Sequence, residues 1–469
     1  MGGFFGVVSS EDCVADLFYG TDYHSHLGTQ RGGLCVRNGN SFVCSIHNIT
    51  NAQFRSKFED DLQAMHGTMG LGIISDYEDQ PLVVSSHLGT YAIVTVGKVN
   101  NIEQLTARLL GRNGTHFTQI RNGEINPTEL VTNLIDGEPT FQDGIRHAHS
   151  VIDGSCSLLV LDDRGIVAAR DRLGRTPVAI GRKDGAHAVT METSALPNLG
   201  YEVEHVLGPG EVLRVTADGI ETLVPAGEQR QVCSFLWIYY GYPASCYENI
   251  NVEACRNRCG AALARADNVQ VDFVAGIPDS GIGHAIGYAA EANLPYRRPF
   301  VKYTPTWPRS FMPQEQRVRD LVAKMKLIPV EELIDGNRLL FCEDSIVRGT
   351  QLSDIIKRLF DRGALEVHMR PACPPLLYSC KFLNFSRSRS ELDLAGRRAI
   401  LELDGKADSR LDEYCNPDSE RHTAMVDRIG RRLELTSLRY QRLDDMIEAI
   451  GLPREKLCTY CWNGEELYV

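Results

Sequence analysis

Apolar and polar residues follow two different patterns along the chain. In the first half, short runs rich in Val and Ile are separated by Gly, Asn and Asp, and the clearest runs are GFFGVV, LGII, YAIVTVG, SLLVLDDRGIVAARD and HAVTMET. This spacing predicts stacked antiparallel strands with only a few helices, one of them at about Thr128–Leu134. We therefore expect the first part of the chain to form a mainly antiparallel α+β structure.

From about residue 233 the pattern changes to strand-then-helix units. VDFVAG is followed by the loop IPDSG and the stretch GHAIGYAAEA, and RLLFC is followed by EDSIVRGT and QLSDIIKRLFDRG. Such units predict a parallel sheet with crossover helices, which is an α/β structure. The polar segment PAGEQRQ precedes the change, so we expect two domains, residues 1–228 and 229–469. Residues 386–432 are rich in charge and show no clear pattern.

Composition narrows the class of protein. The 469 residues carry a formal net charge of -12, which argues against a general partner among nucleic acids or anionic membranes. No stretch approaches the ~20 apolar residues of a membrane span, and the N-terminus lacks the basic region of a signal peptide. We therefore expect a cytoplasmic protein that acts on small molecules. The 14 cysteines are then not expected to form a disulfide framework, which leaves metal binding, a cluster or packing.

The stretch CEDSIVRGTQL carries the most chemical information. Glu343 and Asp344 end an apolar strand, and a short loop of small and polar residues leads from them into a helix. Such a loop directs free backbone N–H groups and the positive end of the helix dipole at one point, which suits a phosphate. The two acids beside it suit ribose hydroxyls or a hydrated Mg²⁺. The alternative is an ordinary strand–helix loop with Thr350 as a cap and two solvated acids.

EDSIVRGT resembles the acidic pair and phosphate loop of type I phosphoribosyltransferases, and SIVRGT resembles more narrowly the glutamine phosphoribosylpyrophosphate amidotransferase family. Further segments resemble that family in the same order along the chain: LFYGTDYHSHLGTQRGG, ARDRLGRTPVAIG, METSAL, LGPGEVL, IPDSGIGHAIGYA, VKYTPTWPRSFMP and AKMKL. The resemblance covers about nine tenths of the chain, and residues 386–432 are its weak part. It implies an N-terminal nucleophile hydrolase-like αββα sandwich followed by a type I phosphoribosyltransferase domain.

The resemblance also implies a reaction, in which ammonia displaces pyrophosphate from phosphoribosylpyrophosphate with the help of Mg²⁺. The positions that it assigns to substrate binding are Asp279, Ser280, Ser345, Arg348, Gly349 and Thr350. The metal would be held by Ser280, Glu343 and Asp344, although Glu343 stands where the family usually has an aspartate. Lys302 and Arg309 match cations of a loop that closes over pyrophosphate, which completes the catalytic set with the two acids.

The glutamine-hydrolysing half departs from the family. In that family an N-terminal cysteine attacks glutamine, and its place is taken here by Gly2. The arginine that would hold the glutamine carboxylate is missing from IISDYEDQ, and Val96 and Pro127 replace an asparagine and an aspartate of the glutamine site. Four losses in separate segments predict a folded domain without glutaminase activity. The competing hypothesis is that Cys13 or Cys35 replaces the lost nucleophile.

Cys458 and Cys461 form a Cys-x-x-Cys pair, which by itself is compatible with zinc, a cluster, redox chemistry or chance. The Bacillus-type members of the family hold a [4Fe–4S] cluster, and the resemblance assigns Cys233 and Cys380 as the other two ligands. Cys373 is a nearby competitor for Cys380. Four thiolates suit either zinc or iron–sulfur, so the choice of a cluster comes from the resemblance alone.

Two main hypotheses for function follow. The first is an amidophosphoribosyltransferase-like enzyme that uses free ammonia or another small amine. The second is a regulatory pseudoenzyme that binds phosphoribosylpyrophosphate or a nucleotide without turnover. A third possibility is a separate partner protein that supplies the ammonia. The family further implies a homotetramer regulated by purine nucleotides.

Overall fold

The computed structural model describes residues 2–111, 116–121, 123–303, 327–383 and 390–468. The chain divides into two compact units, of which the first runs to Val232 and includes a short segment from Lys381, and the second begins at Cys233. Within the described ranges, every helix is too short or too polar to traverse a lipid bilayer.

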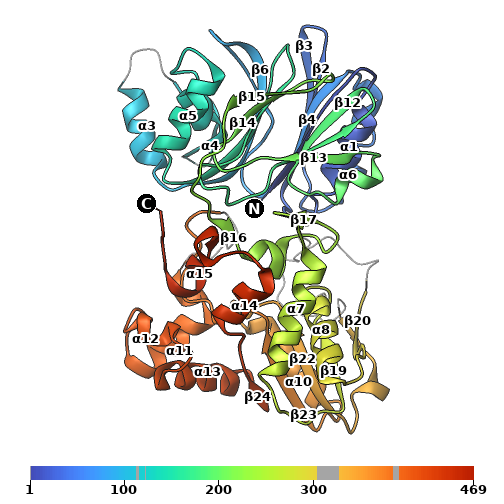
Figure 1. Ribbon diagram of the computed structural model, residues 1–469, viewed down its shortest axis with the longest axis vertical. Coiled ribbons are helices and arrows are strands. Elements are labelled where there is room, and N and C mark those ends of the chain that lie inside the picture. The colour runs from blue at the N-terminus through green and yellow to red at the C-terminus, as the bar shows by residue number, and fades with distance from the viewer. Residues whose placement is uncertain (1, 112–115, 122, 304–326, 384–389, 469) are drawn as a thin grey trace. The chain divides into compact units, whose positions relative to one another are not determined.

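The first unit contains two antiparallel sheets (Figure 1). The larger sheet consists, in order, of β13 (Glu202–Val206), β11 (Ala179–Lys183), β12 (Ala186–Thr190), β1 (Gly3–Ser9), β4 (Met69–Ser75), β2 (Arg31–Asn38) and β3 (Ser41–Asn48). The smaller sheet consists of β15 (Ile220–Val224), β14 (Val212–Val215), β10 (Ile166–Ala169), β9 (Gly154–Leu161), β6 (Gly89–Val99) and β5 (Leu82–Ser86). All five apolar runs of the first half lie in these strands.

Helices cover the outer face of each sheet. The helices are α1 (Val14–Asp22), α2 (Phe54–Phe58) and α6 (Ala195–Asn198) on the larger sheet, and α3 (Ile102–Leu110), α4 (Pro127–Ile135) and α5 (Phe141–Val151) on the smaller one. Strand β1 shows why both faces of the larger sheet are apolar. Phe4 and Val8 lie in the core between the sheets, whereas Phe5 and Val7 lie in the core under α1. The predicted αββα sandwich is confirmed, with more helices than the strand-dominated pattern suggested.

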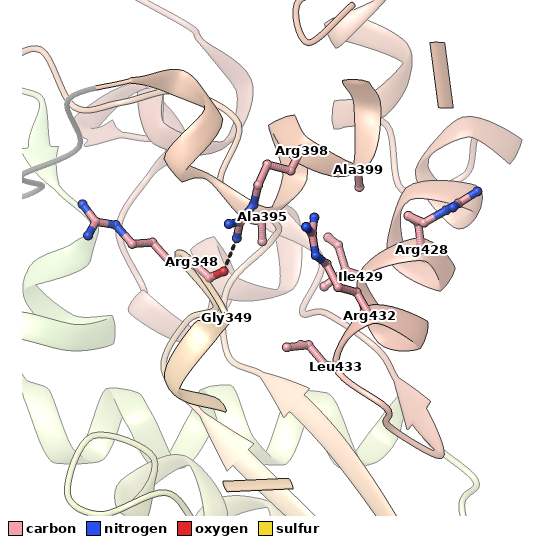
Figure 2. Close-up of a pocket in the computed structure, with 9 residues that line it drawn as sticks. All are labelled: Arg348, Gly349, Ala395, Arg398, Ala399, Arg428, Ile429, Arg432 and Leu433. Atoms are coloured by element: carbon pink, nitrogen blue, oxygen red, sulfur yellow. Dashed lines mark hydrogen bonds between the residues drawn. The ribbon is translucent and has the colours of Figure 1, made fainter. Parts of the chain in front are cut away.

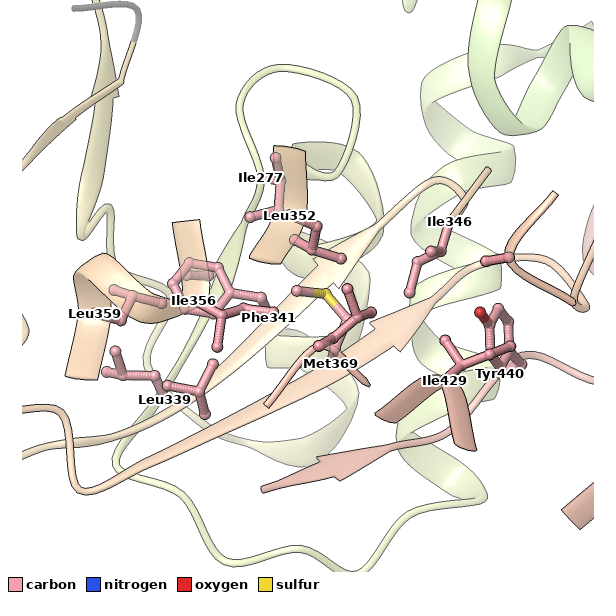
Figure 3. Close-up of a cluster of buried hydrophobic side chains, with 14 of the residues drawn as sticks. Ile277, Leu339, Phe341, Ile346, Leu352, Ile356, Leu359, Met369, Ile429 and Tyr440 are labelled. Carbon is pink, nitrogen blue, oxygen red and sulfur yellow. The ribbon is translucent and has the colours of Figure 1, made fainter. Parts of the chain in front are cut away.

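The second unit contains the predicted parallel sheet. Its strands, in order, are β19 (Phe273–Gly276), β22 (Arg338–Glu343), β23 (Glu366–Pro371) and β24 (Ser437–Leu438). The helices that pack on it include α7 (Val252–Arg265), α8 (Ile282–Ala292) and α10 (Thr350–Phe360). In the core drawn in Figure 3, Ile356 and Leu359 of α10 pack with Phe341 of β22. The stretch QLSDIIKRLFDRG, which follows the loop EDSIVRGT, therefore forms the expected crossover helix and buries one apolar face.

The charge-rich stretch without a clear pattern is mainly helical where the structure describes it. The C-terminal helices are α11 (Ala395–Asp404), α12 (Leu411–Cys415), α13 (Glu420–Arg432), α14 (Leu443–Ile450) and α15 (Tyr460–Asn463). Met425 and Ile429 of α13 are buried in the same core as α10, and its charged residues are mostly exposed. Tertiary packing of one narrow apolar face therefore stabilises a helix that its charge content obscured.

One pair of cysteines departs from expectation. Cys35 and Cys44 lie directly opposite one another on β2 and β3, with their Cα atoms 4.0 Å apart, and are joined by a disulfide. The other twelve cysteines form no disulfide. The expectation that cysteines serve packing or metal binding is therefore wrong for this pair, because strand register brought together two residues that the sequence alone could not pair.

Candidate functional site

The predicted phosphate loop lies at the carboxyl end of a central strand. β22 pairs with β19 on one side and with β23 on the other, so Glu343 emerges where ligands bind in open α/β sheets. Residues 344–349 then lead into the first turn of α10. Gly349 precedes that helix with a φ of 75°, a conformation that glycine adopts without strain. The loop therefore ends at the free N–H groups of an 11-residue helix, as the sequence predicted.

The two acids are buried side by side. Glu343 and Asp344 are 8% and 5% exposed, and the Asp344 backbone N–H donates to Glu343 Oε1 at 3.1 Å. Ser280 Oγ donates to Glu343 Oε1 at 2.8 Å, and Ser345 Oγ donates to Asp344 Oδ2 at 2.5 Å. Burial raises the pKa of Glu343 well above its ordinary value, and the neighbouring charge of Asp344 raises it further. A cation bound here would favour the ionised form of Glu343.

The oxygen donors at this point suit Mg²⁺ better than a metal that needs a complete protein cage. In the described parts of the chain, no group of three or more His, Cys, Asp or Glu side chains is arranged to hold a metal ion. Mg²⁺ is commonly held by one or two carboxylates together with substrate phosphates and water. Glu343, Asp344 and the Ser280 hydroxyl fit that mode of binding.

The second predicted loop meets the first across the sheet. Asp279 and Ser280 follow β19, and close backbone contact holds their loop against the end of β22: the Ile277 N–H donates to the Cys342 carbonyl oxygen at 3.0 Å. A Cβ added at Gly281 would lie 2.2 Å from that same oxygen, so only glycine fits there. This close approach places Ser280 within hydrogen-bond distance of Glu343.

Lys302 joins the same group of residues. It ends the short strand β20 (Phe300–Lys302), which pairs with β21 (Leu327–Pro329), and its Nζ contacts the carboxylate of Asp279. Both side chains are exposed to solvent. The structure thus brings Lys302, Asp279, Ser280 and the acidic pair together from three separate segments.

The remaining predicted residues divide into two groups. Arg348 is described: its guanidinium pairs with Asp393 at 3.2 Å, and its backbone carbonyl accepts a hydrogen bond from Arg398. Arg309 and the side chain of Thr350 lie outside the described residues. Sequence reasoning did not point to Asp393 or Arg398, because they lie about 45 to 50 positions further along the chain. The concentration of charge in that segment was the only signal.

The four cysteines assigned to a cluster gather in one place. Cys233 and Cys458 lie on β16 (Val232–Cys233) and β25 (Leu457–Cys458), which form a two-stranded sheet. The Cys461 thiol shares a hydrogen bond with Cys380 and interacts electrostatically with Cys233 and Cys458. Four thiols of this kind suit coordination by four thiolates. Among the described residues, however, no group of three or more His, Cys, Asp or Glu side chains, these cysteines included, is positioned as in a metal site. The cluster itself stays a prediction.

Cys373, the competitor for Cys380, lies elsewhere. Its thiol is fully buried and interacts with Trp462 and with Asp344 rather than with the group of four. Cys380, which the resemblance assigns as the fourth ligand, therefore lies with Cys233, Cys458 and Cys461, whereas Cys373 does not.

Gly2, which stands where the resemblance expects the nucleophile of the family, has no room for a side chain. Gly2 is buried, and a Cβ built on it would lie 2.4 Å from the carbonyl oxygen of Ile74 in β4. Val96 is 4% exposed and forms part of the core between the two sheets. Pro127 occupies the first position of α4, where a residue without an N–H is well suited. Each of the three residues therefore has a structural role where it stands.

Neither alternative nucleophile suits the chemistry. Cys13 is 1% exposed, and burial, reinforced by the negative charge of Asp12, raises the pKa of its thiol to about 12. A thiol with that pKa carries almost no thiolate near neutral pH. Cys35 is bonded to Cys44 and has no thiol to offer.

Comparison with known proteins gives matches over both units. A profile described as "Glutamine amidotransferase domain" matches residues 69–198. The chain is 32% identical to an amidophosphoribosyltransferase of Archaeoglobus fulgidus over 79% of this chain and 75% of the relative. It is 27% identical to that of Methanocaldococcus jannaschii over 99% and 97% of the two chains. The structure is similar to glutamine phosphoribosylpyrophosphate amidotransferase from B. subtilis complexed with ADP and GMP, with a TM-score of 0.84, 26% identity and coverage of 99% and 98%.

Proposed function

The chain belongs to the amidophosphoribosyltransferase family, and we propose that within this family it joins free ammonia, or another small amine, to phosphoribosylpyrophosphate. The family carries out the first step of purine biosynthesis and consists of pentosyltransferases. Two observations support the proposal: the hydrogen bond of Ser280 to Glu343 next to the loop after β22 in the second unit, and, in the first unit, a Gly2 whose added Cβ would collide with the Ile74 carbonyl oxygen.

The phosphoribosyl half supplies positioning rather than a covalent catalyst. Ser345 and the backbone N–H groups up to Gly349 hold the 5-phosphate, and Asp279 with Ser280 faces the pyrophosphate and its metal. Ser280, Glu343 and Asp344 would hold Mg²⁺, which would supply positive charge for the departing pyrophosphate. Fixed donors of this kind act where charge develops in the transition state.

The reaction itself is a displacement at the anomeric carbon. The amine lone pair forms a bond to that carbon, the carbon–oxygen bond to pyrophosphate breaks, and its electron pair leaves with pyrophosphate. The amine then loses one proton to solvent, which gives phosphoribosylamine when the amine is ammonia. Lys302 lies beside Asp279, where its positive charge stabilises the negative charge of the departing pyrophosphate. Arg309 is proposed for the same role from the resemblance.

One assay tests this function. Pyrophosphate release from phosphoribosylpyrophosphate and Mg²⁺ is measured with ammonium chloride at raised pH, with glutamine, and with no amine. We expect release with ammonium chloride and only background release with glutamine. Release with glutamine, accompanied by glutamate, would show that the glutaminase site works after all. Addition of lysate fractions together with glutamine tests whether a partner protein supplies the ammonia.

A binding-only role is the second candidate, and one observation favours it. Glu343 replaces the usual aspartate and lies buried beside Asp344, which raises its pKa and favours a protonated form that holds Mg²⁺ poorly. A pseudoenzyme of this kind would bind phosphoribosylpyrophosphate in a calorimeter and release no pyrophosphate with any amine.

We also propose that Cys233, Cys380, Cys458 and Cys461 hold a [4Fe–4S] cluster with a structural role. The support is the convergence of the four thiols and the similarity to the Bacillus-type enzymes. Iron and sulfide analysis of anaerobically purified protein is expected to give about four of each per chain. One equivalent of zinc without iron would reject the cluster. Regulation by purine nucleotides and a homotetrameric assembly are further proposals, since the B. subtilis relative was solved with ADP and GMP.

A further inference from the structure

The phosphate loop that leads from β22 into α10 is held through its carbonyl groups by helix α11 (Figure 2). The Ala395 N–H, at the first position of α11, donates to the Val347 carbonyl oxygen at 2.8 Å. One turn further along, Arg398 donates to the Arg348 carbonyl oxygen, and Figure 2 draws this bond. Arg398 also lines a pocket at this contact together with Arg432 of α13. Two successive peptide units of the loop are therefore fixed by α11.

Fixing a carbonyl group also orients the N–H group of the same peptide unit. The bonds from Val347 to Arg348 and from Arg348 to Gly349 are trans, and the C=O and N–H groups of a planar trans peptide point in opposite directions. The N–H groups of Arg348 and Gly349 therefore point away from α11. Because the Gly349 N–H donates to no other group of the described residues, it remains available to an anion.

Arg397 anchors α11 through a different face of the helix. Its side chain is 6% exposed, and its Nε donates to the Leu377 carbonyl oxygen, while Nη1 donates to the Ala407 carbonyl oxygen at 3.0 Å. A Cβ added at the adjacent Gly396 would lie 2.5 Å from the Leu377 side chain, so the helix and the segment around Leu377 are in close contact. Arg397 therefore fixes the place of α11 beside this segment.

The segment that Arg397 contacts is itself fixed at two points. Directly after β23, the Ala372 N–H donates to the Glu343 carbonyl oxygen at 2.8 Å. Further along, the N–H groups of Leu377 and Tyr378 both donate to the Cys461 carbonyl oxygen at 3.1 Å. Two successive prolines between these points restrict the backbone further. The segment therefore gives α11 a fixed support.

We propose that Arg397 is a positioning residue for the 5-phosphate of the substrate, because it holds α11 where that helix orients the N–H groups of the phosphate loop. This inference rests on the proposed function, which assigns the loop to the 5-phosphate. Arg397 itself does not touch the ligand. Its contribution is preorganisation: donors that are already ordered bind an anion without the entropic cost of fixing the loop.

Calorimetry with two ligands separates positioning from general stabilisation. Ribose 5-phosphate, whose phosphate group the loop would hold, and pyrophosphate with Mg²⁺, which the loop after β19 would hold, are each titrated into the full chain. We expect Arg397→Met to weaken ribose 5-phosphate binding by about ten-fold and to leave pyrophosphate binding unchanged. Arg397→Lys, which keeps the charge and a donor for Leu377, should recover most of the affinity. Arg431→Met is the matched control, because Arg431 is an exposed position of α13.

A second variant tests the other contact of α11. Ala395→Pro removes the N–H that holds Val347, at the first helical position, where proline is well accepted. The preceding Leu394 has a ψ of 130°, which suits a residue before proline. We expect the same selective loss of ribose 5-phosphate binding, and this variant keeps the proposal testable if Arg397→Met does not fold.

Limited trypsin digestion tests the same link without a ligand. Arg348 is an exposed residue of the loop, and cleavage after it requires the loop to open locally. Mass spectrometry of the fragments should show faster cleavage after Arg348 in Arg397→Met and in Ala395→Pro, and unchanged cleavage in Arg431→Met.

Four outcomes would overturn the proposal. They are equal loss of affinity for both ligands, equal effects of Arg397→Met and Arg431→Met, no recovery in Arg397→Lys, and cleavage that rises evenly at all sites of the second unit. If the unmodified chain binds no ribose 5-phosphate, that result counts against the proposed function, and the digestion still decides whether Arg397 orders the loop.

Discussion

Gly281 provides the sharpest test of how the fold builds the proposed site. Its ideal Cβ would lie 2.2 Å from the Cys342 carbonyl oxygen and 2.8 Å from the Ile277 nitrogen, whereas an ordinary contact begins at 3.4 Å. Gly281→Ala must therefore push the loop after β19 away from β22 by about an ångström. The expected cost is about 1–3 kcal/mol in the free energy of unfolding, as for other overpacked sites.

The same displacement moves Ser280 away from Glu343. Ser280 Oγ and Glu343 Oε1 are 2.8 Å apart in their hydrogen bond. A misplacement of about 1 Å lowers catalysis by roughly a hundred-fold in well-positioned sites. Denaturant unfolding measures the loss in the free energy of unfolding. Ammonia-dependent pyrophosphate release, assayed under conditions well below the unfolding transition, measures the loss in rate. Gly430→Ala in α13 is the control, since its added Cβ would be 3.4 Å from its nearest neighbour, the Leu438 Cβ of β24, which is an ordinary contact distance. Unchanged stability together with an unchanged rate in Gly281→Ala would refute this account of the site.

Three further predictions concern other parts of the molecule. Gly2→Cys is expected to gain no glutaminase activity, because the Ile74 carbonyl oxygen occupies the space for its side chain; glutamate formation is the readout, and any glutamine-dependent release would contradict it. Without Mg²⁺, the free energy of unfolding should fall as pH rises above 4.5, the ordinary pKa of glutamate, because folding raises the pKa of Glu343. Denaturant unfolding at a series of pH values is the measurement, and Glu343→Gln should remove this part of the pH dependence. An unchanged pH dependence in Glu343→Gln would show that it has another origin. Asp267 and Arg370 form a buried ion pair. Asp267→Ala should lower the free energy of unfolding, measured with denaturant, by about 3–5 kcal/mol, because Arg370 would stay buried without its ionic partner. A decrease below about 1 kcal/mol would mean that water reaches this pair.

Local sequence was sufficient to predict much of the fold. The strands of the first unit, the strand-then-helix units of the second and the change between the two patterns near residue 233 depend on neighbours within a few residues. The acidic pair and the phosphate loop were predictable for the same reason: strand, loop and helix follow one another directly in the chain. The residues that we propose as ligands of phosphate and Mg²⁺ therefore lie mostly in one short segment of the chain.

Contacts between distant segments were not predictable in this way. The pairing of Cys35 with Cys44 depends on strand register, and the contact of Lys302 with Asp279 depends on where β20 lies relative to the sheet. The pocket that Arg398 and Arg432 line was missed because these two residues belong to different helices, α11 and α13, in a stretch without a clear apolar period. Nothing in the spacing of these residues indicates that their side chains meet.

Position 2 shows the same division most clearly. The sequence has glycine, which carries no side chain, at the position where the resemblance expects the family's nucleophile, and it places this residue at the start of an apolar strand. Folding adds that the Ile74 carbonyl oxygen of β4 fills the space which a side chain would need, so restoring a cysteine requires movement of a central strand. Residue identity follows from the sequence, whereas the space available to a residue depends on the packing of segments that meet only in the folded chain.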